Sequence, residues 1–532
     1  MRLALAQFNP VVGDVRGNAT RIAELAVRAR DALRADAILL PELALTGYPP
    51  EDLLLRPDFL DAVDAAAARL AQAVPDIALV LGLPLRQGGA LYNSALLLHG
   101  GQERARYHKQ HLPNFGVFDE RRYFTPGHAP CVADIAGLAC GLSICEDIWH
   151  PGPAAQARTA GAACLLNLNA SPFHLGKHAE RAAVVRARVA ETGLPVVYLN
   201  QVGGQDELVF DGDSFVSDAH GTLTLRLPPF AEALEVVELP RSVTGPVRLD
   251  DADEASLYAA LLLGVRDYVR KNDFPGVLLG LSGGVDSALV LCLAADALGA
   301  AQVTAVLMPS RYTASMSNED ALAQCAALGV AHHLIPIEPA FHTLLDMLAG
   351  PFAGAPPDVT EENLQSRIRG LLLMALSNKT GRLLLSTGNK SELATGYATL
   401  YGDMNGGFAP LKDVSKTWVY RLGRWRNAQG PAPVIPERVL TRPPSAELRP
   451  DQTDQDSLPD YAVLDRILEG FVEQDESVER LIARGLPAAE VRRVAALILR
   501  NEYKRRQAPP GVRVTRRAFG RDRRYPITSG YR

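Results

Sequence analysis

Cysteine is scarce in this sequence, with six among 532 residues, and no two cysteines form a C-x-x-C pair. The sequence therefore lacks the cysteine spacing that is typical of a disulfide framework or a zinc ribbon. Because disulfide-rich proteins occur mainly in oxidising compartments, this absence favours a reducing one. No run of about 18 uncharged apolar residues occurs, and the short apolar stretch before Gln7 is too short for a secretory signal. We predict a cytoplasmic protein with no membrane partner.

An excess of positive charge is also missing. Lys and Arg total 55 against 60 for Asp and Glu, a formal net charge of −5. No global positive field draws the chain to nucleic acid, and we expect no nucleic-acid partner. Aromatic residues make up only 6%, but hydrophobic residues together reach 47%, enough for well-filled cores. At roughly 150 residues per domain, this length predicts two large domains or three smaller ones.

Short apolar runs alternate with longer amphipathic segments, which predicts an α/β fold. In the first half we expect a helix over 20–35 and strands over 37–40, 77–83, 138–144, 163–169 and 195–200. In the second half, expected strands over 277–281, 303–308, 333–337 and 383–387 with helices between them predict a Rossmann-like, doubly wound parallel sheet. A stretch with proline and glycine that ends in DDADE separates the halves, so we expect domains over 1–245 and 246–532.

Three reactive residues each follow an expected strand in the first half: Glu42, Lys109 and Cys145. Taken singly, a cysteine after an apolar run is usually a small buried hydrophobe, and a glutamate or lysine at a strand end is usually a solvated charge. Together they supply a nucleophile, a base for its proton, and a cation that would keep the thiolate ionised and stabilise an oxyanion. The combination predicts nucleophilic attack on a carbonyl.

The segments PELALTGYPPEDLL, HKQHLPNFGVFDERRYF and ICEDIWHPGP resemble the carbon-nitrogen hydrolase (nitrilase) superfamily, specifically its glutamine amidases, over about residues 1–240. The resemblance implies a four-layer α-β-β-α sandwich. It makes Cys145 the nucleophile, Glu42 the general base and Lys109 the stabiliser of the tetrahedral intermediate, with Glu120 orienting that lysine. The residues that it implies for glutamine binding are Tyr48, Phe115, Glu146, Ser171 and Lys177.

Of these glutamine-binding positions, Ser171 has an alternative explanation and Lys177 departs from the family. Ser171 is equally well explained as the N-cap of the helix that follows it. At the position of Lys177 the family often has an arginine. The compact ammonium group of lysine would then bind the glutamine carboxylate in place of a planar guanidinium group. His174 and His178 could share a helical face, but no zincin-type Glu spacing accompanies them, and we predict no metal site here.

The second half begins with GVLLGLSGGVDSALVL, an expected strand, a glycine turn and an expected helix. Two glycines let backbone N–H groups face an anion, and the serines add hydroxyl donors, so SGGVDS predicts a phosphate-binding loop. It lacks the G-K-[ST] of a Walker loop and the G-x-G-x-x-G of a dinucleotide fingerprint. It resembles the PP-loop of ATP pyrophosphatases, which activate an oxygen by adenylylation. The implied ATP-binding residues are Gly280, Ser282, Gly283, Gly284, Asp286, Ser287, Thr387 and Lys416.

A second cluster, LLLSTGNKSELATGYATLYGDMNGGFAPLKDVSKT, contains Glu392 and Asp403. Magnesium favours a few carboxylates plus phosphate oxygens, so Asp286, Glu392 and Asp403 are candidate ligands; solvated helical acids are the alternative. With ENLQSRIRG, the cluster resembles the NAD synthetase family over roughly 255–532. The residues that it implies for the deamidated dinucleotide are Asn363, Arg367, Glu392 and Lys504. The basic C-terminal segment also resembles that family and, with its aromatic residues, we expect it to dock instead of forming a disordered tail.

Both resemblances in one chain imply a ligase for the last step of NAD⁺ biosynthesis. The front half would release ammonia from glutamine through a cysteine thioester. The rear half would adenylylate nicotinic acid adenine dinucleotide with Mg²⁺ and ATP, and ammonia would then displace AMP, so that AMP, pyrophosphate and glutamate accompany NAD⁺. The expected partners are these small molecules and further copies of the chain, bound through the synthetase half.

Two other functions are compatible with part of this pattern. Another glutamine-fed PP-loop synthetase could make GMP or asparagine, but asparagine-type enzymes need an N-terminal cysteine where this chain has Arg2, and GMP-type enzymes use a Cys-His-Glu triad. A non-catalytic nucleotide-binding regulator could keep both folds. The presence of Glu42, Lys109 and Cys145 together argues against that second alternative.

Overall fold

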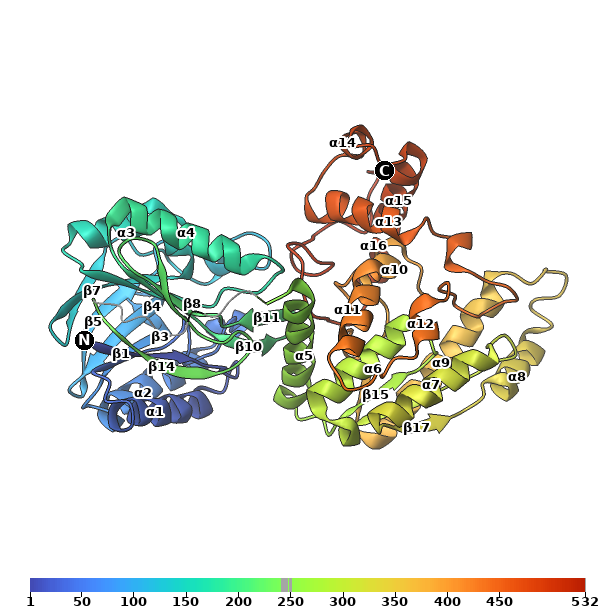
Figure 1. The fold of residues 1–532 in the computed structure, drawn as a ribbon, viewed down its shortest axis with the longest axis horizontal. Helices are drawn as coiled ribbons and strands as arrows, with labels where there is room; N and C mark the ends of the chain where they lie inside the picture. The colour runs from blue at the N-terminus through green and yellow to red at the C-terminus, as the bar shows by residue number, and fades with distance from the viewer. Residues whose placement is uncertain (241–246, 248–250, 532) are drawn as a thin grey trace. The chain divides into compact units, whose positions relative to one another are not determined.

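The computed structural model describes residues 1–240, 247 and 251–531 (Figure 1). The chain divides into two compact units, Met1–Asp251 and Ala252–Arg532. The boundary that we predicted between residues 245 and 246 lies outside the described residues. Within the described part of the chain, no helix is long and apolar enough to cross a membrane.

The first unit contains two six-stranded sheets. The first sheet runs in the order β14 (Ala233–Glu238), β1 (Arg2–Gln7), β2 (Ala37–Leu39), β3 (Ala78–Gln87), β4 (Ala90–His99) and β5 (Gln102–His108). The second runs in the order β13 (Leu223–Arg226), β12 (Phe215–Ser217), β9 (Val196–Asn200), β8 (Cys164–Asn169), β7 (Leu138–Ile144) and β6 (Cys131–Ile135). Alternate side chains of both sheets, such as Leu5 and Leu166, share one buried core, because successive residues of a strand point to opposite faces.

Helices cover the outer faces of both sheets. Apolar residues of α1 (Val15–Asp31) and α2 (Pro57–Ala73) pack on the first sheet, and those of α3 (Pro151–Thr159) and α4 (Lys177–Thr192) pack on the second. Figure 1 shows the two helix pairs on opposite sides of the sheets. The predicted four-layer α-β-β-α sandwich is therefore confirmed. The first helix starts earlier than predicted because the Asp14 side chain caps it, accepting a hydrogen bond from the Gly17 N–H at 2.8 Å.

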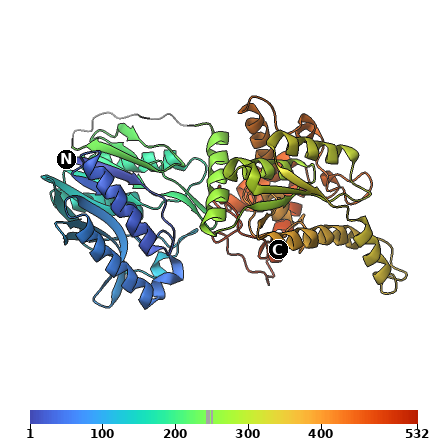
Figure 2. The same ribbon diagram turned by 90° about the horizontal axis from the view of Figure 1, so that it is seen from below.

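The second unit is built on a four-stranded parallel sheet with the order β17 (Ala331–Leu334), β16 (Val303–Leu307), β15 (Val277–Gly280) and β18 (Leu383–Leu385). Helices α6 (Val285–Leu298), α7 (Ser315–Leu328) and α9 (Val359–Thr380) connect the strands, and Figure 2 shows helices on both sides of the sheet. The predicted doubly wound arrangement is confirmed. Because β15 and β18 are neighbours, the loops after them meet at the point where the winding reverses, the usual ligand site of such folds.

One predicted strand is misplaced. The expected strand over 333–337 is the edge strand β17, which begins at Ala331 and ends at Leu334. Pro336 lacks the N–H that a sheet ladder requires, so regular pairing ends before it. The edge position also leaves all four β17 residues exposed, which removes the burial pattern that would have fixed the register.

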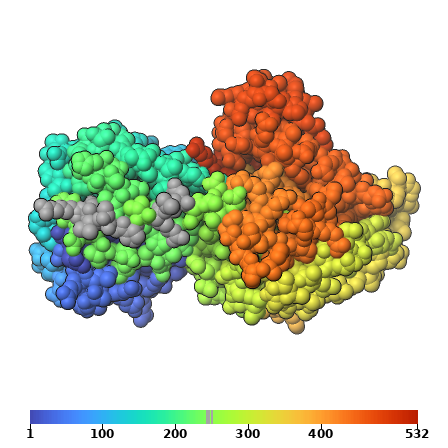
Figure 3. Space-filling model, viewed as in Figure 1, coloured from blue at the N-terminus to red at the C-terminus, as the bar shows by residue number. Residues whose placement is uncertain are grey.

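From residue 390 onward, the regular elements of the described chain are all helices. The helices that pack around a shared apolar cluster are α10 (Lys390–Thr395), α13 (Tyr461–Leu468), α14 (Val478–Ala483) and α15 (Ala488–Arg500). Figure 3 shows the C-terminal helices as a red and orange lobe of the second unit. The remaining helices of this unit are α5 (Asp253–Lys271), α8 (Glu338–Leu348), α11 (Lys416–Ala428), α12 (Glu437–Thr441) and α16 (Glu502–Arg505).

Candidate active sites

The three reactive residues of the first unit lie at the carboxyl ends of three strands, as predicted. Glu42 follows β2, Lys109 comes directly after β5, and Cys145 comes directly after β7. All three are buried, with exposed fractions of 0%, 1% and 4%. Gly82 on β3 allows this arrangement, because a Cβ atom there would lie 2.3 Å from the Pro41 carbonyl oxygen, beside Glu42.

Lys109 joins the two predicted glutamates. Its ammonium group donates hydrogen bonds to Glu42 Oε1 at 2.7 Å and to Glu120 Oε1 at 2.8 Å. Asn93 Nδ2 donates to the same Glu42 oxygen at 2.7 Å, and the Ala170 N–H donates to the other oxygen at 3.0 Å. The Glu42 carboxylate is thus held at both oxygens. The relation of Glu120 to the lysine, inferred only from resemblance, is present in the structure.

Charges within this buried group shift one another's pKa values. Burial by itself lowers the pKa of Lys109, but the carboxylates of Glu120 and Glu42 outweigh it and raise the pKa well above its usual value. Burial raises the pKa of Glu120 to about 7, although Lys109 opposes the shift. The lysine therefore stays a cation at neutral pH and is available to an oxyanion.

Cys145 occupies a left-handed backbone conformation, with φ of 44°, at the start of a short turn (Cys145–Trp149). A non-glycine residue rarely adopts this conformation, and it often marks a functional residue. Burial raises the pKa of the thiol well above its usual value, the charge of Glu42 adds to the shift, and Lys109 only partly offsets it. This direction favours a neutral thiol in the resting site, so the attack on a carbonyl would need a base to remove its proton.

Four of the five predicted glutamine-binding residues are near this group. The Tyr48 hydroxyl donates to Glu120 Oε1 at 2.9 Å. Glu146 is close enough to Cys145 for its carboxylate to raise the pKa of the thiol. Lys177 is close enough to Cys145 for the sulfur to influence the pKa of its ammonium group. Ser171 accepts a hydrogen bond from Arg181 Nε at 3.2 Å. The N-cap interpretation of Ser171 is wrong, because α4 begins at Lys177.

Lys177 and Phe115 differ in how firmly they are held. The Lys177 ammonium lies 4.2 Å from the centroid of the Trp149 ring and 3.3 Å from Glu180 Oε2. Burial lowers its pKa, with Arg181 adding to the effect. Phe115 is 61% exposed on the loop between Lys109 and Glu120, and its ring meets only the edge of Phe118 among the described ring contacts.

Asp147 is a site residue that the sequence reasoning missed. Its Oδ1 accepts hydrogen bonds from the N–H groups of Gln110 and His111, next to Lys109. Its Oδ2 accepts from the Tyr107 hydroxyl and from the Ile144 N–H, next to Cys145. Asp147 therefore ties the lysine loop to the cysteine turn. The second acidic residue after the cysteine in ICED was the available signal.

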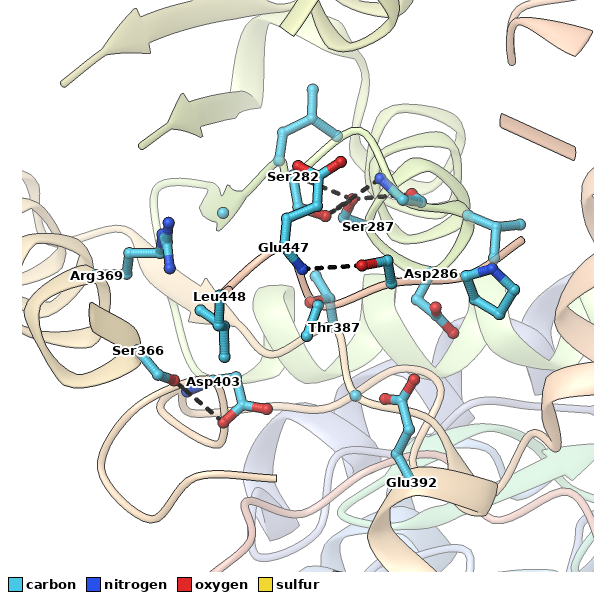
Figure 4. A pocket seen from close by; sticks show the side chains of 18 of the residues that line it. Ser282, Asp286, Ser287, Ser366, Arg369, Thr387, Glu392, Asp403, Glu447 and Leu448 are labelled. Atoms are coloured by element: carbon cyan, nitrogen blue, oxygen red, sulfur yellow. Dashed lines mark hydrogen bonds between the residues drawn. The ribbon is translucent and has the colours of Figure 1, made fainter. Parts of the chain in front are cut away.

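The second unit holds a cavity of about 320 Å³ at the loops after β15 and β18 (Figure 4). The predicted ATP-binding residues that line it are Gly280, Ser282, Gly284, Asp286, Ser287, Thr387 and Lys416. Gly283 has φ of +80°, and a Cβ atom there would lie 2.3 Å from the Ser317 carbonyl oxygen. Only glycine can therefore pack at that position of the loop. The Ser282 and Ser287 hydroxyls lie 3.1 Å apart.

Lys416 connects two of the predicted acidic ligands. Its ammonium group donates to Asp286 Oδ2 at 2.5 Å and to Glu392 Oε1 at 3.0 Å. Burial and the neighbouring Asp286 raise the pKa of Glu392 to about 8, although Lys416 opposes the shift. Asn389 was missed by the sequence reasoning: it donates to Asp286 Oδ1 at 2.8 Å and accepts from the Glu392 N–H at 3.0 Å.

Asp403, the third predicted acidic ligand, lines the same cavity but is held differently. Its Oδ1 accepts from the Thr399 N–H at 2.6 Å and from the Ser366 hydroxyl, the second bond being drawn in Figure 4. Burial raises its pKa. The described residues contain no cluster of three or more His, Cys, Asp or Glu side chains placed to hold a metal ion, so these three carboxylates do not form a closed metal site.

Three predicted dinucleotide-binding residues meet around one loop of the cavity wall. The Thr399 hydroxyl donates to Asn363 Oδ1 at 2.9 Å, and Arg367 Nε donates to the Leu400 carbonyl at 3.2 Å. Lys504 donates to the carbonyls of residues 396 and 398. Thr399 lines the cavity, so Asn363, Arg367 and Lys504 support the cavity wall through the loop that contains Thr399. Glu392 lines the cavity itself. Arg369, which the sequence reasoning did not select, also faces the cavity, and Figure 4 shows it there.

Two family models match the chain, one for each unit. The carbon-nitrogen hydrolase model matches residues 2–249, and the NAD synthase model matches residues 257–508. The fold and the two sites thus define a class: an enzyme that joins an amide-hydrolysing unit to an ATP-dependent synthase unit.

Comparison with whole proteins is more specific. The glutamine-dependent NAD(+) synthetase of Xanthomonas campestris pv. campestris is 54% identical over 539 residues, covering 100% of this chain and 98% of the relative. The solved synthetase of Acinetobacter baumannii, in complex with adenosine diphosphate, is 45% identical with a TM-score of 0.82, covering 100% of this chain and 99% of that one. The chain belongs to the glutamine-dependent NAD(+) synthetase family. The synthetase of Cytophaga hutchinsonii, at 24% identity and a TM-score of 0.86, shares the fold.

Proposed function

We propose that this chain amidates nicotinic acid adenine dinucleotide to NAD⁺, using ATP and the amide nitrogen of glutamine. One observation carries the proposal: a single chain holds both a buried Glu-Lys-Cys site and a phosphate-binding cavity at the switch point of a doubly wound sheet. Family membership over the full length supports it. The products are NAD⁺, AMP, pyrophosphate and glutamate.

In the first unit, Cys145 Sγ attacks the side-chain carbonyl carbon of glutamine. Glu42 takes the thiol proton and gives it to the leaving nitrogen, so ammonia departs and a γ-glutamyl thioester remains. The Lys109 ammonium stabilises the oxyanion of the tetrahedral intermediate. Glu42 then takes a proton from water, which attacks the thioester, and glutamate and the thiol are released. Glu120 keeps Lys109 oriented, because both Glu120 and Glu42 accept hydrogen bonds from its ammonium group.

The remaining glutamine contacts are proposed on position and charge. Lys177 and Ser171 would hold the α-carboxylate and Glu146 the α-ammonium group of glutamine, since their charges or dipoles match those groups. Tyr48 and Phe115 would pack along the side chain of the substrate. Lys177 has the firmest support, because the Trp149 ring holds its ammonium group near the cysteine.

In the second unit, the carboxylate of the dinucleotide attacks the α-phosphate of ATP, forming an adenylate and releasing pyrophosphate. Ammonia then attacks the activated carbonyl, loses a proton, and AMP departs. The backbone of residues 282–284 and the hydroxyls of Ser282 and Ser287 would bind phosphate oxygens at the start of α6. Lys416 and Thr387 line the same cavity and would bind further phosphate oxygens. Asn363, Arg367 and Lys504 would support the dinucleotide through the loop that they hold.

The acidic residues of this cavity fit a magnesium ion in part. Asp286 lies in the first turn of α6 and Glu392 in α10, and one oxygen of each contacts the ammonium of Lys416, so a cation is already stabilised between them. Magnesium needs only one or two protein carboxylates when phosphate oxygens complete its shell. We propose Asp286 and Glu392 as its ligands, with Asp403 as a third candidate. Bound with ATP, the ion neutralises phosphate charge.

The predicted self-association through the synthetase unit and the predicted cytoplasmic location stay proposals. Large apolar side chains are exposed on β17, α8 and α9 of that unit, namely Leu334, Met347, Val359 and Leu371. Such residues are typical of an interface with another copy of a chain. Sedimentation analysis would test the association.

A product assay tests the proposed function. The purified chain would be supplied with the deamidated dinucleotide, Mg-ATP and glutamine, and NAD⁺, AMP and glutamate would be measured together. We expect NAD⁺ and AMP in equal amounts and at least as much glutamate. Formation of ADP in place of AMP, or glutamate without NAD⁺, would contradict the adenylylation mechanism.

A further inference from the structure

The short helix α10 carries Glu392 into the ATP cavity but has only six residues. A helix of this length is not stable by itself, because nucleation costs more free energy than so few hydrogen bonds return. Its position must therefore be set by what surrounds it. Part of these surroundings comes from a distant part of the sequence, the segment 501–517 near the C-terminus.

Residues 501–505 hold the carboxyl end of α10. Asn501 Nδ2 donates to the Thr395 carbonyl at 2.7 Å, and Arg505 donates to the Ala394 carbonyl at 2.7 Å. Lys504 donates to the carbonyl of Gly396, just beyond the helix, at 2.8 Å. Three side chains thus satisfy carbonyl groups that a helix end leaves without intrahelical partners.

A buried ionic cluster holds the amino end of α10. Lys390, 1% exposed, contacts Asp413 Oδ1 at 2.8 Å and Glu473 Oε1 at 2.7 Å. It also donates to the Thr515 hydroxyl oxygen at 2.9 Å and to the Arg517 carbonyl at 3.2 Å. Lys390 is two residues before Glu392, so the cluster fixes the chain directly before the acidic residue in the cavity.

Asp413 connects the same cluster to Lys416. It is 1% exposed, and its Oδ2 accepts hydrogen bonds from the N–H groups of Val514 at 2.8 Å and Thr515 at 2.7 Å. The Thr515 hydroxyl donates to Asp413 at 2.8 Å. Lys416 follows three residues later and begins α11. Thr515 therefore contacts both of the segments that carry Glu392 and Lys416, and these segments also contact each other directly at Lys390 and Asp413.

The C-terminal segment also packs tightly against the stretch that contains Ala409 and Asp413. The Ala409 N–H donates to the Pro510 carbonyl at 2.8 Å, and a Cβ atom at Gly511 would lie 2.1 Å from the Ala409 carbonyl oxygen. Charged groups buried in this way contribute little net stability compared with apolar packing, but they fix one geometry because each unpaired alternative is costly. Such a cluster suits a place where the relative position of two groups matters.

We propose that the C-terminal segment 501–517 is a positioning element of the ATP site, and that the Thr515 hydroxyl sets the relative position of Glu392 and Lys416 through Asp413 and Lys390. This inference rests on the proposed function of those two residues. Thr515 does not touch substrate in this role. Its effect would appear in the transition state, where the charges of Glu392 and Lys416 must match developing charge on the transferred phosphoryl group.

The test replaces Thr515 in the full-length chain and measures NAD⁺ synthesis from ammonium chloride, so that the glutamine site plays no part. Thr515→Val keeps the shape and removes the hydroxyl, Thr515→Ser keeps the hydroxyl, and Ser477→Ala removes the N-cap of α14 elsewhere in the same lobe. We expect Thr515→Val to lower kcat roughly tenfold or more, with the KM for ATP within about twofold of wild type. Thr515→Ser should retain at least half of kcat, and Ser477→Ala should lower thermal stability without lowering kcat.

Equal losses of kcat in Thr515→Val and Thr515→Ser would overturn the inference, because the hydroxyl would not be the cause. A kcat loss in Ser477→Ala that equals the loss in Thr515→Val would also overturn it, because loosening of the lobe would explain both. The proposed function is tested separately by the wild-type chain and by Glu392→Gln in the same assay. If the wild type makes no NAD⁺ from ammonium and Mg-ATP, the proposed function fails and not only the role of Thr515.

Discussion

The two sites differ in how the positive charge of their buried lysine is balanced. In the first unit, Lys109 is enclosed with two carboxylates and is shielded from solvent, so its charge is balanced before substrate binds. In the second unit, Lys416 is paired with two acids on the wall of a cavity of about 320 Å³. An uncharged amide can enter the first site without changing its charge balance. Under the proposed function the second site accepts phosphate groups, and Lys416 would exchange its acidic partners for phosphate oxygens once a cation neutralises those acids.

This difference also separates the two half reactions experimentally. Under the proposed function, ammonia is the nucleophile of the second site, so ammonium salts should replace glutamine as the nitrogen source and allow the second site to be assayed without the first. A change confined to the first unit should therefore alter only glutamine-supported synthesis, and a change in the ATP cavity should alter synthesis from both nitrogen sources.

Replacement of the nucleophile should have the largest effect. Cys145→Ala removes the thiol that forms the thioester, and we expect glutamine-supported NAD⁺ synthesis to fall roughly 1,000-fold or more. Synthesis from ammonium should stay within about twofold of wild type, because no group of the second site changes. Cys131→Ala, a partly exposed cysteine on β6, is the matched control and should retain both activities. Loss of both activities in Cys145→Ala would break the separation.

Asp286→Ala should have the next largest effect, and it should affect both nitrogen sources. The change removes a carboxylate that faces the cavity and leaves Lys416 with one acidic partner, so we expect AMP formation to fall roughly 100-fold or more. Asp296→Asn, at the other end of α6, changes an acid that pairs with Arg426 and should leave AMP formation unchanged. Normal AMP release by the Asp286 variant would remove this residue from the site.

Lys177→Ala should give a smaller and more selective effect. Loss of a cation that would bind the glutamine carboxylate should raise the KM for glutamine roughly 10- to 100-fold, with a smaller change in kcat. Lys177→Arg should stay within about threefold of wild type, because the guanidinium can also lie over the Trp149 ring. Kinetics with ammonium should not change in either variant. An unchanged KM for glutamine in Lys177→Ala would contradict the assignment.

The smallest effect concerns the protonation of Cys145. Because burial and Glu42 raise the pKa of the thiol, the thiolate should be absent at pH 7 and should appear only as the pH rises beyond the usual thiol range. The ultraviolet absorbance of thiolate should therefore be equal in the wild type and in Cys145→Ala between pH 6 and 8. Excess absorbance in the wild type at pH 7 would show a pre-formed thiolate and would remove the need for Glu42 as a base.

The sequence predicted where the reactive residues of the first unit lie, because each of them follows a strand and strand ends meet at one edge of a sheet. It could not show the protonation state of Cys145, since that depends on burial and on carboxylates distant in the chain. Asp147 was missed for a similar reason: its four hydrogen bonds join two loops that the sequence separates by about 35 residues.

In the second unit, the PP-loop motif was sufficient to predict the strand, glycine turn and helix that line the cavity, but not the contacts of the C-terminal segment. The contacts of Thr515 with Asp413 and Lys390 span more than 100 residues, and no local pattern indicates such pairs. The docking predicted from the aromatic residues of the tail holds for Phe519, which is 6% exposed, but Ile527 is 50% exposed. Hydrogen bonds of buried side chains, such as those that Asp413 accepts from the N–H groups of Val514 and Thr515, also fix the position of this segment.

Glutamine labelled with ¹⁵N in the side-chain amide tests the central claim most directly. The labelled glutamine would be supplied with the deamidated dinucleotide and Mg-ATP, and the NAD⁺ formed would be analysed by mass spectrometry. We predict that the wild type places ¹⁵N in the carboxamide of NAD⁺, with one AMP formed per NAD⁺, and that Cys145→Ala forms no labelled NAD⁺. Labelled NAD⁺ from the Cys145 variant at the wild-type rate would contradict the claim that this thiol releases the nitrogen.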